Sequence, residues 1–176
     1  MRERLTSLLA TGFGLGFSRI APGSMGALLG VLIAATLSGL AWETQALVAG
    51  VLAILAIPIC NAGEENFGRK DDRRIVADEY LTFPLCTIGL PWALNPWLLG
   101  MAFVVNRILD VVKPPPARQA QDLHGGLGIA ADDIVSSLYA LAVNHALWWA
   151  ARNLWPETWR LPDHLLLFLN MLKFPA

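Results

Sequence analysis

Four long stretches without a charged side chain constrain the fold of this chain more than any other feature. They cover residues 20–42, 44–63, 80–106 and 134–151, with lengths of 23, 20, 27 and 18 residues. A helix that spans a bilayer needs about 20 predominantly apolar residues. The first two windows each fit one crossing, and the fourth fits when it borrows a residue or two at its ends. The pattern therefore predicts an all-α, multi-pass membrane protein.

The third window differs from the others because Pro91 and Pro96 interrupt it. Proline breaks a helix and disfavours helix in the residue before it. We therefore expect a Pro-broken hairpin around residues 80–106, with one helix that ends near Gly89 and another that restarts near Pro96. This raises the expected number of apolar helices to about four to five.

The composition agrees with a chain that lies in a membrane. Hydrophobic residues make up 55% of the chain and charged residues 15%, and the mean hydropathy is +0.50. Soluble domains contain about 25% charged residues. The formal net charge of −1 gives no basic surface for nucleic acid, so we expect no such partner. The length indicates one domain, with a helical membrane domain over residues 1–151 and an interfacial or packing extension over residues 152–176.

The charged residues are segregated along the chain. Of the 27 Asp, Glu, Lys and Arg residues, 10 lie in residues 64–79 and 7 in residues 107–133. Basic residues precede the first window and follow the second, so the positive-inside rule places the N-terminus and residues 64–79 in the cytoplasm. A hairpin over residues 80–106 would return residues 107–133 to the same side. The two polar segments are then expected to form one site on the cytoplasmic face.

Carboxylates occupy the borders between these polar segments and the apolar windows. Asp78 and Glu79 precede the third window, and Asp132 and Asp133 open the fourth. Adjacent carboxylates at such a border are costly unless a cation or a proton neutralises them. With Asp110 they offer hard oxygen donors that suit magnesium, with manganese as an alternative. Acidic helix starts that favour the helix dipole explain the same pairs without a metal.

Basic, glycine and hydroxyl residues nearby are candidates for binding an anion. Arg107, Asp110 and Lys113 share one face of a helix that the prolines at 114–116 end. Arg and Lys side chains bind phosphate oxygens, glycines let the backbone approach a ligand, and a histidine can donate a proton. A salt-bridged turn and helix-contact glycines are the alternatives. The candidate substrate-binding residues are Arg107, Lys113, Ser24, His124, Gly125 and Gly126.

Four segments, read in order, resemble the phosphatidylglycerophosphatase A family of bacterial membrane proteins. They are APGSMGALLG, IVADEY, NRILDVVKPPP and DLHGGLGIAADDIV, and the resemblance covers about residues 12–140. It implies an all-helical protein of the bacterial inner membrane with a cytoplasm-facing site. It also implies magnesium-dependent hydrolysis of phosphatidylglycerophosphate to phosphatidylglycerol. Asn106, where the family usually has an aromatic residue, and Thr82, where it tends to have glycine, depart from its pattern.

The resulting hypothesis is a metal-dependent lipid phosphatase. Asp110, Asp133, His124 and Arg107 are its candidate catalytic residues, with His124 as the proton donor to the leaving alkoxide. The metal ligands are expected to be Asp78, Glu79, Asp110, Asp132 and Asp133. The alternatives are a phosphatase for another lipid or soluble phosphate, a divalent-cation transporter, and a non-catalytic membrane scaffold. The sequence leaves open whether the protein forms a homo-oligomer.

Overall fold

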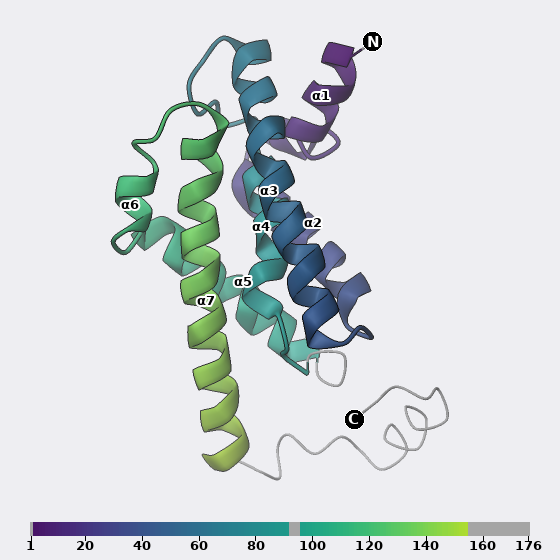
Figure 1. The fold of residues 1–176 in the computed structure, drawn as a ribbon, viewed down its shortest axis with the longest axis vertical. Helices are drawn as coiled ribbons and strands as arrows, with labels where there is room; N and C mark the ends of the chain where they lie inside the picture. Colours follow the sequence, from purple (N-terminus) through teal and green to yellow (C-terminus); the bar gives the residue numbers. More distant parts are fainter. Residues whose placement is uncertain (1, 92–95, 155–176) are drawn as a thin grey trace.

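The computed structural model describes residues 2–91 and 96–154, and within these ranges the chain is helical with no strand. The all-α prediction is therefore confirmed (Figure 1). The α-helices and the two short 3-10 helices follow in the order α1 (Arg2–Ala10), η1 (Leu15–Phe17), α2 (Pro22–Leu37), α3 (Trp42–Phe67), α4 (Ala77–Thr82), η2 (Phe83–Thr87), α5 (Pro96–Val112), α6 (Ala117–Ala120) and α7 (Gly126–Leu154).

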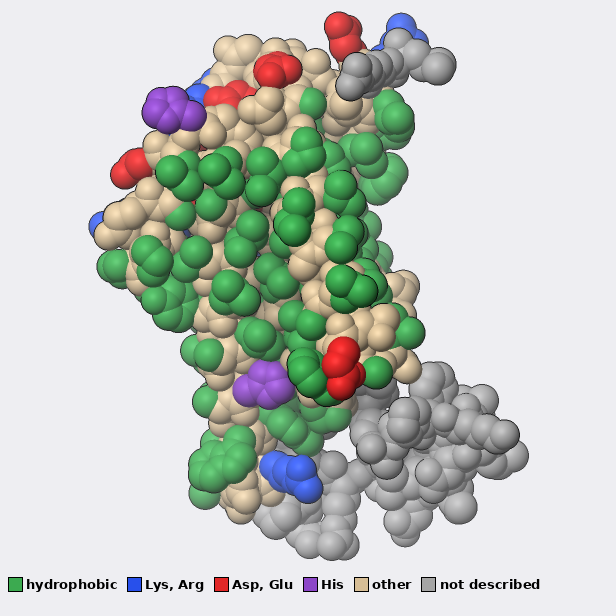
Figure 2. Space-filling view, in the orientation of Figure 1, with side chains coloured by type: hydrophobic (Ala, Val, Ile, Leu, Met, Phe, Trp, Pro, Cys, Tyr) green, Lys and Arg blue, Asp and Glu red, His purple; other side chains and the backbone are tan. Residues whose placement is uncertain are grey.

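Two described helices are long and apolar enough to cross a membrane. These are α3, with 26 residues, and α7, with 29 residues, whereas α2 is apolar but has only 16 residues. Large hydrophobic side chains are exposed on these helices, among them Leu32 of α2 and Leu47 and Ile54 of α3. Figure 2 shows hydrophobic side chains over the middle of the molecule and charged side chains toward its two ends. These features suit a membrane protein, while the number of crossings stays a prediction.

The third apolar window folds differently from the expected pair of helices. After six residues α4 gives way to the 3-10 helix η2, so no α-helix reaches Gly89. Pro84 explains the difference, because its ring removes a backbone donor and breaks the α-helical pattern. The second helix, α5, does begin at Pro96 as predicted. Residues 92–95, in the expected turn, lie outside the described residues.

The start of α7 also differs from the prediction. The helix begins at Gly126, eight residues before the fourth window, so Asp132 and Asp133 lie inside it rather than at its first turn. Both are buried, with 4% and 5% exposure. The helix-start explanation for this acidic pair is therefore wrong, because their backbone amides are already in helical positions. Two buried carboxylates in an apolar helix need a partner from elsewhere.

Small residues let the helices approach closely. In Figure 1, α7 runs along most of the molecule beside α3, and α4 lies between them and α2. The buried face of α3 carries alanines, glycine and Cys60, and it packs on α4 and α7 through Val76, Ala77 and Ala130. Cys60 and Cys86 are both buried and free. Most of the expected C-terminal extension, residues 155–176, lies outside the described residues.

Candidate active site

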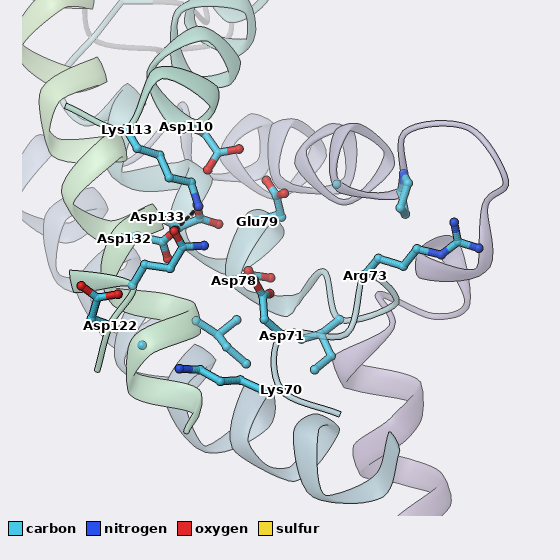
Figure 3. Close-up of a pocket in the computed structure, with 16 residues that line it drawn as sticks. Lys70, Asp71, Arg73, Asp78, Glu79, Asp110, Lys113, Asp122, Asp132 and Asp133 are labelled. Atoms are coloured by element: carbon cyan, nitrogen blue, oxygen red, sulfur yellow. Dashed lines mark hydrogen bonds and ion pairs between the residues drawn. The ribbon is translucent and has the colours of Figure 1, made fainter. Parts of the chain in front are cut away.

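The short helix α4 carries Asp78 and Glu79 in its first turn. Two hydrogen bonds to the end of α1 fix its position, since the Val76 amide donates to the Ala10 carbonyl (2.9 Å) and the Tyr80 hydroxyl donates to the Leu9 carbonyl (2.9 Å). Val76 and Tyr80 are buried, with 0% and 4% exposure. Because this face of α4 is packed in the core, the two carboxylates point away from it toward α5 and α7 (Figure 3).

Helix α5 brings a cation and a third carboxylate to α4. The Arg107 guanidinium forms an ion pair with the Glu79 carboxylate and donates to Asp110 Oδ2 at 2.7 Å. Arg107 and Asp110 therefore share a helix face, as their spacing predicted. The pair between residues 79 and 107 also shows that the two polar segments meet. This contact is the one that the expected reversal of the chain over residues 80–106 requires.

Lys113 directly follows α5 and reaches α7. It has a positive φ of 48° just before the prolines that stop the helix, and its Nζ lies 2.5 Å from Asp132 Oδ2. The next residue of α7, Asp133, lies beside Glu79 and Asp110. One carboxylate oxygen from each of these three residues lies within 4.8 Å of the other two. Three segments that are distant in the sequence thus supply one cluster of oxygens.

These side chains line a cavity of about 520 Å³, here called the acidic cavity. All five predicted metal ligands are in its lining, and Figure 3 shows Asp78, Glu79, Asp110, Asp132 and Asp133 around the same space. The full lining is Pro22, Gly23, Lys70, Asp71, Arg73, Ile75, Asp78, Glu79, Asp110, Lys113, Gln121, Asp122, Gly128, Ile129, Asp132 and Asp133.

Charge in the acidic cavity is unbalanced. Seven carboxylates line it against three cations, so a phosphate would be repelled unless further positive charge were present. Burial raises the pKa of Glu79 to about 7, although the Arg107 charge opposes this. Burial, together with the charge of Glu79, also raises the pKa of Asp78 well above its usual range. The carboxylates therefore gain stability from a bound cation or from protons.

The donor set fits a hard divalent cation. Within the described residues, Asp78 Oδ1 and Asp133 Oδ2 are buried and have no hydrogen-bond partner. Buried carboxylate oxygens are costly without a partner, and oxygen ligands are those that magnesium and manganese prefer. Glu79, Asp110 and Asp133 are the residues best placed to share one ion. Asp132 is already held by Lys113, which places it at the edge of such a site.

Gly23 at the start of α2 lies against the cluster. A Cβ atom at this position would lie 2.3 Å from Glu79 Oε1 and 3.3 Å from an Arg107 guanidinium nitrogen. Pro22 begins the helix, where its missing amide is not needed, and Gly23 then leaves room for the carboxylate. The candidate Ser24 is half-buried in the same turn but is not among the cavity-lining residues.

Other predicted substrate-binding residues are not brought to the cavity. His124 is exposed and does not line it. The glycines have a packing role: a Cβ at Gly126 would lie 2.1 Å from the Ile57 carbonyl oxygen, and the Gly126 amide donates to Asn61 Oδ1 at 3.3 Å. Gly125 has a φ of +64° and also faces Asn61. Gly125 and Gly126 thus let α7 start against α3, which is the helix-contact alternative.

Two cavity-lining cations, Lys70 and Arg73, were missed as individual site residues. The sequence marks residues 64–79 as polar, but it gives no sign of which cations in that segment face the cavity. Gly23 was also missed, because its segment indicates a helix start with Ser24 as the candidate phosphate-binding residue. The role of Gly23 becomes visible only in the folded structure, where it lies against Glu79.

A family model and two similar proteins carry the same family name. The family model described as phosphatidylglycerophosphatase A matches residues 8–148. Phosphatidylglycerophosphatase A of Escherichia coli (strain K12) is 35% identical over 138 residues, which cover 77% of this chain and 79% of that protein. The Haemophilus influenzae protein of the same name is 32% identical over 142 residues, covering 80% and 86%.

A further relative, from Bacteroides thetaiotaomicron, is provisionally named phosphatidylinositol-3-phosphatase. It is 35% identical over 146 residues, which cover 77% of this chain and 89% of that protein. No solved structure matches the chain. Both phosphatidylglycerophosphatases match most of the chain, and the family model covers every segment that lines the acidic cavity. The chain therefore belongs to the phosphatidylglycerophosphatase A family and is a phosphatase.

Proposed function

We propose that this protein hydrolyses the terminal phosphomonoester of phosphatidylglycerophosphate, with magnesium bound in the acidic cavity. The observation that carries the proposal is the convergence of five carboxylates from α4, α5 and α7 on one cavity, two of them with unpartnered buried oxygens. The products are phosphatidylglycerol and inorganic phosphate. The names of the Escherichia coli and Haemophilus influenzae relatives support this choice of substrate.

The carboxylates of Glu79, Asp110 and Asp133 would hold the ion, with Asp78 and Asp132 beside them. When bound, magnesium supplies positive charge that offsets the phosphate charge and polarises its P–O bonds. In the hydrolysis, a water oxygen bonds to phosphorus, the bond from phosphorus to the glycerol oxygen breaks, and that oxygen takes a proton. Manganese would serve as a substitute because it prefers the same oxygen donors.

Arg107 and Lys113 have a different role from the one their charges first indicate. Both are already paired with carboxylates, Arg107 with Glu79 and Asp110, and Lys113 with Asp132. We assign them to orienting these ligands, so that the oxygens are held in place before an ion binds. His124 remains the candidate proton donor from the sequence, although its position outside the cavity lining gives it no direct support.

Phosphate release from phosphatidylglycerophosphate tests the proposal. Asp110→Asn and Asp133→Asn should each abolish release, and chelation should stop the wild-type reaction until magnesium or manganese is added. Calorimetric titration with magnesium alone should show weakened binding in both variants. Near wild-type rates from both variants would refute the assigned roles.

We also propose that the protein lies in the bacterial inner membrane with the acidic cavity facing the cytoplasm. The basic residues of the N-terminus and of residues 68–76 support this orientation through the positive-inside rule. Arg69 is exposed, and the two native cysteines are buried. An Arg69→Cys variant should therefore react with a membrane-impermeant maleimide only after the cells are opened. Labelling of intact spheroplasts would place this loop outside.

A phosphatase for a different lipid phosphate is the second candidate. The Bacteroides thetaiotaomicron relative, with its different printed substrate, favours keeping it. Rates on phosphatidylglycerophosphate, phosphatidate and phosphatidylinositol 3-phosphate would separate the two. A cation transporter is less well supported, because the site carboxylates gather around one cavity instead of spreading along the helices.

A further inference from the structure

The segment between α1 and α2, residues 11–21, is here called the aromatic loop and exposes three large hydrophobic side chains. Phe13, Phe17 and Ile20 are each more than half exposed. None of the three lines the acidic cavity, although the loop leads directly into Pro22 and Gly23, which do. Exposed hydrophobic side chains that gather beside a site indicate a surface for a partner or a membrane.

Close packing holds the aromatic loop in one shape. A Cβ atom at Gly16 would lie 2.0 Å from the Arg74 carbonyl oxygen, and one at Gly12 would lie 2.9 Å from Val76 Cγ2. The two glycines therefore let the loop lie directly against the chain that leads into α4. Phe13 has a positive φ of 58°, which is costly for a bulky residue and persists only where the surrounding structure imposes it. The exposure of its side chain is thus a fixed feature of the fold.

The backbone of the aromatic loop is paired internally. Every amide from Thr11 to Ser18 donates to a backbone carbonyl of residues 7–15, at distances of 2.8–3.2 Å. The Ile20 amide donates to Ser18 Oγ at 3.3 Å. A loop in water does not need such pairing, because water binds its amides, whereas a backbone in contact with lipid must satisfy its own polar groups. The hydrogen bonds and the exposed side chains together indicate lipid around this loop.

Three exposed tryptophans in the described part of the chain mark one end of the molecule. Trp42 begins α3, Trp97 lies in the first turn of α5, and Trp149 lies near the end of α7. Each is more than half exposed. In Figure 1 these three helix ends lie at the end of the molecule away from α1. Tryptophan is enriched where the hydrocarbon core of a bilayer meets water, so these residues indicate one boundary of that core.

Helix lengths give the distance from this boundary to the acidic cavity. Asp133 precedes Trp149 by 16 residues on α7, which corresponds to about 24 Å with a rise of about 1.5 Å per residue. Helix α2 starts at the aromatic loop, ends five residues before Trp42 and also has 16 residues. The hydrocarbon core of a bilayer is about 30 Å thick. Both helices therefore place the loop and the carboxylates within this thickness, close to its second boundary.

We propose that the aromatic loop lies in the bilayer at the cytoplasmic boundary of the hydrocarbon core, with Phe13, Phe17 and Ile20 among the acyl chains. Arg19, exposed in the same loop, would extend its charge to the phosphates of anionic headgroups. The wall of the acidic cavity at Pro22 then lies just below the headgroups, so the substrate reaches the carboxylates without leaving the bilayer. This inference rests on the proposed function and on the proposed membrane location.

Fluorescence quenching in nanodiscs of phosphatidylethanolamine and phosphatidylglycerol tests the placement. Phe17→Cys is labelled with a small thiol-reactive fluorophore, which the two buried native cysteines do not take up. A lipid with a nitroxide near the top of its acyl chain should quench this label at least about threefold more than aqueous iodide does. Arg69→Cys, at an exposed position of the loop that follows α3, is the matched control and should show the reverse order.

Phosphate release gives a second readout. Phe17→Gln/Ile20→Gln should raise KM for phosphatidylglycerophosphate in nanodiscs by about 10-fold and change kcat by less than about twofold, because two apolar side chains no longer hold the cavity at the lipid. A short-chain form of the same lipid, dissolved as monomers, should be hydrolysed with unchanged kcat/KM. Phe17→Leu/Ile20→Leu keeps the apolar surface and should behave as the wild type. Leu5→Gln, at an exposed position of α1, should leave both rates unchanged.

A label at position 17 that iodide quenches as strongly as the label at position 69 would overturn the inference, since the loop would then lie in water. Protection from both quenchers would also overturn it, because a second copy of the chain would then cover the loop. So would equal losses on the bilayer and monomeric substrates, or no loss on either. Failure of the proposed function looks different: the wild-type protein releases no phosphate, while the quenching still reports the depth of the loop.

Discussion

The two long helices, α3 and α7, have similar lengths and different tasks. In the most apolar part of each, 28% of α3 and 50% of α7 is buried. The buried face of α3 consists of alanines, a glycine, Cys60 and one polar residue, Gln45. The buried face of α7 includes Asp132, Asp133, Ser136, Ser137 and Asn144. Two helices of similar apolar character therefore bury different side chains, mainly small residues on α3 and several carboxylate and other polar groups on α7.

The largest expected effect comes from the same chemical change on each helix. Asp133→Asn on α7 should lower kcat for phosphate release by on the order of 10³-fold or more, because it removes a buried oxygen from the proposed metal site. Glu65→Gln on α3 makes the matching change at an exposed carboxylate outside the cavity and should leave kcat unchanged. Equal losses in the two variants would show that α3 and α7 do not divide the tasks in this way.

Glycines on the two helices should differ in their tolerance of alanine. At Gly126 of α7 the added Cβ would lie 2.1 Å from the Ile57 carbonyl oxygen and 2.4 Å from the Asn61 amide nitrogen. We expect Gly126→Ala to destabilise the fold by about 1–3 kcal/mol, as overpacking does. Gly50 of α3 meets nothing within 4 Å, so Gly50→Ala should be neutral or stabilise by up to about 1 kcal/mol.

Thermal unfolding in detergent measures both glycine variants. Gly126→Ala should unfold at a lower temperature than the wild type, and Gly50→Ala at the same or a higher temperature. A wild-type unfolding temperature for Gly126→Ala would mean that α7 can move away from α3 at no cost.

Parts of this site could be predicted from the sequence because they depend on local spacing. The three-residue step from Arg107 to Asp110 fixes a shared helix face, and Pro96 fixes the start of α5. The meeting of Asp78 and Glu79 with α5 followed from the expected reversal of the chain. Local spacing and one reversal were sufficient to identify five of the seven carboxylates that line the cavity, whereas Asp71 and Asp122 were not predicted.

Other parts depend on tertiary contacts that leave no local mark. Gly125 and Gly126 have the same sequence signature whether they approach a ligand or the backbone of α3, and only the contact with Asn61 decides. Arg69, Lys70 and Arg73 are three cations within five residues, and the sequence does not distinguish the two that line the cavity from the one that does not. Their difference arises from the path of the loop that Asp72 and Arg74 hold.

A smaller effect is expected for the hydrogen bond that joins α7 to α5. Asn106 Nδ2 donates to Ser137 Oγ at 3.0 Å, and both residues are buried. Side-chain hydrogen bonds between helices in membranes contribute about 0.6 kcal/mol on average. A double-mutant cycle with Asn106→Ala and Ser137→Ala should therefore give a coupling free energy of about 0.6 kcal/mol. A coupling near zero would limit the specialised role of α7 to its carboxylates.

A pH-dependent effect on stability is expected in the loop that follows α3. Hydrogen bonds from the Arg74 side chain lower the pKa of Asp72 to about 2. A lowered carboxyl pKa stabilises the folded state above the ordinary value of about 3.9, and this stabilisation is lost as the pH falls through about 2. Asp72→Asn should therefore unfold at a lower temperature than the wild type at pH 7, and the difference should narrow below about pH 4.

Unfolding temperatures of the wild type and Asp72→Asn between pH 7 and pH 3 provide the measurement. Glu65→Gln serves as the control for general acid effects, since its side chain is exposed on α3. A difference that stayed constant down to pH 3 would mean that Asp72 acts by its shape and not by its charge.

The contact between Gly23 and the carboxylate cluster has a consequence for suppressor genetics. A Cβ atom at position 23 would lie 2.3 Å from Glu79 Oε1. Gly23→Ala would therefore displace the Glu79 carboxylate by steric overlap and would leave its charge unchanged. A suppressor of Gly23→Ala should therefore arise at position 79 as the shorter aspartate, which keeps the charge that Arg107 needs. Selection for restored growth from a library randomised at positions 24 and 79 would show this bias toward position 79.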